Sequence, residues 1–145
     1  MRTKRMKLKL ENVGDVTFWV VIVENTEKMH KYISERYGVS NAEELGAACC
    51  LCNWKSRQIV LVYNCEWLND YIIGHESFHA AMFFAKLNRR KFTMPRWCNM
   101  LLSWGWEETY EEDLADIAGA VVACTWDEIR PRFEFIQKEE AHNAK

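Results

Sequence analysis

The sequence has few of the residues that mark linkers, fibrous proteins or membrane spans. Its 145 residues include two prolines and six glycines and no low-complexity tract, which argues against disordered and collagen-like classes. The apolar stretch 16–23 is far shorter than the ~20 residues of a transmembrane helix. Two acids precede it and no small-residue cleavage site follows, so it does not resemble a signal peptide. We expect one domain, residues 1–145, in the cytoplasm and without a membrane partner.

A strong net charge is also missing. The formal net charge is −2, so no broad basic field is available to attract nucleic acid. The six cysteines include three close together, Cys49, Cys50 and Cys52. They lack the paired CxxC units of a structural zinc site and the spacing of a secreted disulfide framework. We expect reduced thiols in an intracellular protein.

The hydrophobic pattern predicts an α+β fold, a small mostly antiparallel sheet packed on two long helices. Alternation at Met6, Leu8 and Leu10 indicates an edge strand that carries lysines. A hairpin partner is expected at 16–24, and a helix at 26–37 capped by Asn25 and closed by Gly38. Further strands are expected at 47–53 and 58–64, a helix at 67–87, and an acidic helix at 107–126 that ends before Arg130-Pro131.

The first long helix contains His75-Glu76-Ser77-Phe78-His79, which is H-E-x-x-H and uses two of the four histidines in the chain. Residues four apart lie on one helix face, so both imidazoles can bind one Zn²⁺. Glu76 is then placed to take a proton from a zinc-bound water. The competing interpretation is a helix whose histidines only pack or hydrogen-bond.

A catalytic zinc needs a third protein ligand, and the acidic helix supplies candidates. Glu108, Glu112 and Asp116 share a face. The small residues Ala115 and Gly119 flank that face and would let another helix approach closely. One carboxylate would bind the metal while another accepts a hydrogen bond from a ligating histidine.

These residues resemble a known family. His75-Glu76-x-x-His79 followed by Glu112-x-x-x-Asp116 is similar to the H-E-x-x-H…E-x-x-x-D pattern of zincin-type metallopeptidases with a glutamate ligand. The small size and the run from Glu112 to Gly119 resemble short zincin-like proteins of phages and prophages, and more loosely the ImmA/IrrE peptidases. The resemblance covers about residues 59–122. It departs from the ImmA/IrrE type in Ser77-Phe78 and in the tryptophan-rich insert that follows the motif.

The resemblance implies a minimal zincin-like fold and a zinc-dependent peptidase that hydrolyses a peptide bond in an intracellular protein. His75, His79 and Glu112 would bind zinc, with Glu108 as the alternative third ligand. Glu76 would be the general base and Asp116 the partner of a ligating histidine. In such folds an edge strand holds the substrate, and residues 58–64 are the candidate. Candidates for the oxyanion donor are Tyr110, Tyr71, Arg96 and His30.

The segment Asn88–Trp106 combines arginines with tryptophans. It suits a short amphipathic helix that covers or walls the zinc cleft better than a nucleic-acid surface, so no nucleic-acid partner is expected. One alternative function stays open. The chain could be a catalytically silent zincin-fold protein that docks to a host or partner protein. An intact Glu76 favours the enzyme, because a structural site needs no base.

Overall fold

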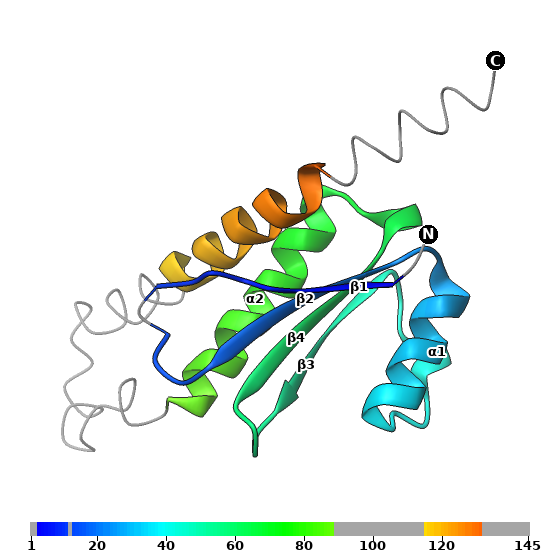
Figure 1. Cartoon of the computed structure of the whole chain (residues 1–145), viewed down its shortest axis with the longest axis horizontal. Helices are drawn as coiled ribbons and strands as arrows, with labels where there is room; N and C mark the ends of the chain where they lie inside the picture. Colours follow the sequence, from blue (N-terminus) through cyan, green and yellow to red (C-terminus); the bar gives the residue numbers. More distant parts are fainter. Residues whose placement is uncertain (1–2, 12, 89–114, 132–145) are drawn as a thin grey trace, which may run out of the picture.

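The structure, a computed structural model, describes residues 3–11, 13–88 and 115–131 (Figure 1). Four strands form one sheet: β1 (Lys4–Lys7), β2 (Thr17–Val23), β3 (Ala48–Asn53) and β4 (Gln58–Asn64). Helix α1 (Thr26–Tyr37) packs on one face of the sheet, and α2 (Asp70–Leu87) packs on the other together with a helix over 115–131. The predicted α+β class, with a small mostly antiparallel sheet, is confirmed.

The sheet order is β1-β2-β4-β3. The pairs β1–β2 and β3–β4 are antiparallel, as the hairpin patterns predict, whereas β2 and β4 are parallel and α1 crosses between them. The two central strands therefore face apolar residues on both sides. Phe18 and Leu61 belong to the core under α2, and Val21 and Val62 to the core under α1.

Asparagine caps set where the helices begin. The side chain of Asn25 accepts a hydrogen bond from the Lys28 amide at 2.9 Å, and Gly38 closes α1 at φ 68°. Asn69 accepts from the Ile72 amide at 3.0 Å and so begins α2 at Asp70. The expected start at residue 67 is wrong because Asn64 caps a separate 3-10 turn, Cys65–Trp67.

The helix over 115–131 extends further than predicted. The expectation that it ends near residue 126 is wrong, because the chain stays helical to residue 131. Val121, Thr125 and Ile129 are four residues apart and all buried, so burying Ile129 extends the helix up to the proline. Gly119 is exposed, and no described atom lies within 4 Å of a Cβ placed there. The expected close approach at Gly119 is not found.

Among the residues that the structure describes, no helix combines the length and the apolar composition needed to cross a bilayer.

Candidate metal centre

The histidine pair lies on the exposed side of α2. The opposite side of this helix buries Ile73, Ala80 and Phe84 against the sheet, so the helical period leaves His75 and His79 facing solvent. Their Nε2 atoms are 3.2 Å apart and their ring centroids 4.8 Å apart. The two imidazoles therefore converge on one point.

This separation fits a metal ion. Two nitrogens that bind zinc at ~2.0–2.1 Å at two corners of a tetrahedron lie about 3.3–3.4 Å apart. The Nε2 atoms of His75 and His79 are already near that separation. The same distance also suits a hydrogen bond between one protonated and one unprotonated ring nitrogen. A shared metal ion and a ring-to-ring hydrogen bond both need the rings turned toward each other. Only metal binding uses the lone pairs of both Nε2 atoms.

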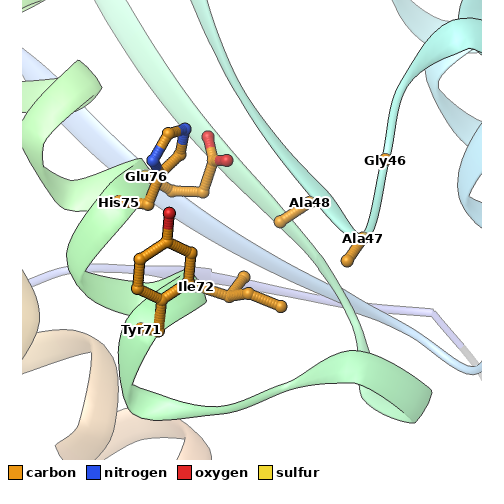
Figure 2. Close-up of a pocket in the computed structure, with 7 residues that line it drawn as sticks. All are labelled: Gly46, Ala47, Ala48, Tyr71, Ile72, His75 and Glu76. Carbon is orange, nitrogen blue, oxygen red and sulfur yellow. The ribbon is translucent and has the colours of Figure 1, made fainter.

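Glu76 is buried, unlike the two histidines of the motif. Its side chain is only 7% exposed and lines a pocket of about 270 Å³ between α2 and the start of β3. Figure 2 shows Tyr71, Ile72, His75 and Glu76 on the helix side, with Gly46, Ala47 and Ala48 opposite. A buried carboxylate therefore faces a cavity walled by small residues.

Burial raises the pKa of Glu76 above its ordinary value of 4.5, and the neighbouring His75 and His79 partly oppose that rise. The pKa of the Cys50 thiol is also raised, first by burial and then by the Glu76 carboxylate. A carboxylate with a raised pKa is a stronger base than one in water. This property suits proton abstraction in the pocket.

The third ligand is not found in the described part of the chain. Within residues 3–11, 13–88 and 115–131, no group of three His, Cys, Asp or Glu side chains could hold a metal ion. Glu108, Tyr110 and Glu112 lie outside the described residues, as do Arg96 and residues 89–106 of the segment Asn88–Trp106. Their predicted roles stay predictions.

Asp116 is described, and the structure does not bring it to the histidines. Its side chain is exposed. Next to it in the sequence, Ile117 and Ala118 pack against Ala81 and Ala85, beyond His79 toward the end of α2. Among the described residues, no hydrogen bond joins Asp116 to either histidine. The role expected for Asp116 stays a prediction that this placement does not support.

Two other expectations about the site change. His30 bonds the Leu45 carbonyl at 3.0 Å from α1, on the opposite face of the sheet, so it is no oxyanion donor for this pocket. Residues 58–64 are wrong as the substrate-holding strand, because β4 pairs with β2 and β3 on its two sides. The strand beside the pocket with one open edge in the described sheet is β3.

Sequence reasoning missed the wall formed by Gly46, Ala47 and Ala48. The sequence did carry a signal for the central position of β4, because Ile59–Tyr63 is an unbroken apolar run. In the structure every residue of this run is buried. Such a run is typical of a strand covered on both faces.

No model of a known protein family, no curated protein and no solved structure matches this chain.

Proposed function

We propose that the protein is a zinc-dependent peptidase that acts on an intracellular protein or peptide. The observation that carries the proposal is the paired geometry of the motif. His75 and His79 converge with a 3.2 Å Nε2–Nε2 separation, and Glu76 turns into the adjoining pocket. A purely structural metal site has no use for a buried carboxylate beside an open cavity.

His75 and His79 would hold the ion, with a third ligand expected from Glu112 or Glu108. A bound zinc ion would acidify a water molecule and polarise a carbonyl. Glu76 would accept the proton of that water and later deliver it to the leaving amine, the two steps of general base and general acid catalysis. In the metal-free protein, burial raises the pKa of Glu76, which makes the carboxylate a better proton acceptor.

The pocket suits an extended peptide. Residues 46–48 lead into β3, the strand whose other side is unpaired among the described residues. A peptide that added to this edge would receive main-chain hydrogen bonds and would place a carbonyl near Glu76. The small side chains of Ala47 and Ala48 leave room for the residues of such a peptide.

The test compares Glu76→Gln with Glu66→Gln. Glu66 is an exposed carboxylate in the turn before α2, so it controls for charge. Cleavage of a randomised internally quenched peptide pool by the zinc-loaded proteins is measured beside their zinc content. We expect Glu76→Gln to keep zinc and lose cleavage by about 10²–10⁴-fold, with Glu66→Gln unchanged. Equal cleavage by all three proteins would overturn the proposal.

A second candidate function is supported by exposed aromatic side chains. Phe78 lies within the motif and is 54% exposed, and Trp67 just before α2 is 60% exposed. Exposed apolar groups of this size occur at docking surfaces. If Glu76→Gln keeps the biological activity of the chain and Phe78→Ser loses it, the protein acts by docking.

A further inference from the structure

The pocket contains one polar side chain to which the mechanism above gives no role. Of the seven lining residues, three carry polar side chains: Tyr71, His75 and Glu76. Glu76 is assigned to proton transfer and His75 to the metal. The Tyr71 phenol is therefore a hydrogen-bond donor in the pocket lining that has no assigned role.

Helical spacing places Tyr71 beside His75, one of the proposed metal ligands. It precedes His75 by one turn of α2, and the two ring centroids are 6.0 Å apart with an interplanar angle of 31°. Figure 2 shows the phenol ring upright along α2, with its hydroxyl directed toward His75. Tyr71, His75 and Glu76 thus line one pocket.

Packing does not explain this tyrosine. Its side chain is 78% exposed, the highest value among the large exposed hydrophobic residues of the described chain. An aromatic ring so exposed adds little to the core, since burial of apolar surface is what stabilises a fold. The same exposure leaves the hydroxyl free to reach a ligand in the pocket.

We propose that Tyr71 donates a hydrogen bond to the oxyanion that develops on the substrate carbonyl. This inference rests on the proposed peptidase function. The proton stays on the tyrosine oxygen throughout, so the residue stabilises charge and transfers nothing. Donors aimed at a developing oxyanion act more strongly in the transition state than on the ground-state carbonyl. Tyr71 should therefore affect kcat much more than KM.

The first test does not depend on catalysis. Inorganic phosphate, a tetrahedral oxyanion, is titrated into Co²⁺-substituted protein, and its binding is followed in the visible spectrum of the metal. The background variant is Glu76→Gln, which removes the carboxylate that would repel an anion. Adding Tyr71→Phe should weaken phosphate binding by about 10-fold or more, as expected for a lost hydrogen bond to a charged group. Adding Tyr37→Phe instead removes the hydroxyl of a tyrosine that packs beside Tyr32 on the far face of the sheet, and it should leave phosphate binding unchanged.

The outcomes distinguish the proposed role of Tyr71 from the proposed peptidase function on which it rests. If no cobalt spectrum forms, the metal site and the peptidase proposal both fail. If cobalt binds but phosphate affinity is equal with and without the Tyr71 hydroxyl, or phosphate does not bind, only the role of Tyr71 is overturned. In the peptide-pool assay, Tyr71→Phe should lower kcat by about 10²-fold or more with KM little changed. Full cleavage by Tyr71→Phe beside loss in Glu76→Gln would reject Tyr71 alone.

Discussion

At the residue scale, the burial of Glu76 has opposite effects on stability and on proton transfer. Its carboxylate is 7% exposed and lines the pocket, so burial raises its pKa and penalises the charged form. The same burial makes the carboxylate a stronger base. A position that costs stability and improves proton transfer is typical of a functional site.

The cost of Glu76 should appear as a pH dependence in metal-free protein. The folded state binds the Glu76 proton above the ordinary pKa of 4.5, so it holds more protons than the unfolded chain between 4.5 and the raised value. The free energy of unfolding then falls as pH rises through that window. In chelator-treated protein, Glu76→Gln should be more stable than wild type at pH 7 and should lack this fall. Denaturant titrations at several pH values measure it. A pH profile equal to that of wild type would contradict the assignment.

The buried Cys49 thiol gives a second prediction at this scale. Burial, with a smaller contribution from Glu76, raises its pKa from 9.0 to about 12. Its thiolate fraction at pH 8 is therefore roughly 1,000-fold below that of an unperturbed thiol, since each pKa unit is a factor of ten. Iodoacetamide at pH 8 should leave Cys49 unmodified in the folded protein and modify it after unfolding. Peptide mass mapping measures this, with the partly exposed Cys124 as the internal comparison. Equal rates of modification at Cys49 and Cys124 would show that β3 does not protect the Cys49 thiol in the folded protein.

At the element scale, the cap of α2 supports the site. The Asn69 side chain holds the Ile72 amide at 3.0 Å, one turn before the motif. Asn69→Ala should lower the free energy of unfolding by about 1 kcal/mol and increase hydrogen exchange of the first turn of α2, where Tyr71 lies. Asn25→Ala, the equivalent change on α1, should cost a similar amount without affecting α2. An unchanged exchange rate at Ile72 in Asn69→Ala would contradict the capping role.

The elements that the sequence predicted best are those with local causes. Asn25 and Gly38 define α1, and the hairpin of β3 and β4 follows from two strand-like segments around a four-residue turn, residues 54–57. The parallel pairing of β2 with β4 joins residues that are about 40 positions apart in the sequence, and no local pattern specifies which strands pair. The assignment of 58–64 as the substrate strand was wrong because this pairing makes β4 a central strand, which only its unbroken apolar run indicated in the sequence.

The candidate site also has a part that the local sequence predicted and a part that depends on distant segments. His75, Glu76 and His79 lie close together on a single helix, so their spacing alone predicts that the two imidazoles share one face, where the structure has their Nε2 atoms 3.2 Å apart. The wall at residues 46–48 comes from a distant segment and became visible only in the fold. The predicted third ligand depends on packing between separate segments, which is why Glu112 and Glu108 could be proposed but not chosen between.

At the scale of the whole molecule, Arg57 joins three segments. Its guanidinium donates to the Leu87 carbonyl and to Asn88 Oδ1, both at 3.1 Å, and lies 2.8 Å from an Asp15 carboxylate oxygen. The turn between β3 and β4 is thereby tied to the end of α2 and to the loop before β2. The backbone of Arg57 is left-handed, at φ 53°, which is uncommon for a residue other than glycine, so these contacts hold it there.

Replacing Arg57 should therefore destabilise the whole domain. Arg57→Lys keeps the charge but cannot reproduce the fork of donors, and we expect a loss of about 1–3 kcal/mol, as for hydrogen bonds between charged and neutral partners. The exposed Lys55 lies in the same turn, and Lys55→Ala should change stability by less than about 0.5 kcal/mol. Chemical denaturation of the two variants measures the difference. Equal stability would show that Arg57 is a passive turn residue.

The central claim is that His75 and His79 form a metal site, and zinc content tests it most directly. The protein is purified without added zinc, dialysed, and analysed by elemental mass spectrometry beside His79→Ala and His30→Ala. His30 bonds a carbonyl on the far side of the sheet, so its variant controls for the loss of any imidazole. We predict about one zinc per chain in wild type and in His30→Ala, and a large loss in His79→Ala. Equal zinc in all three proteins, or none in wild type after zinc is supplied, would contradict the account.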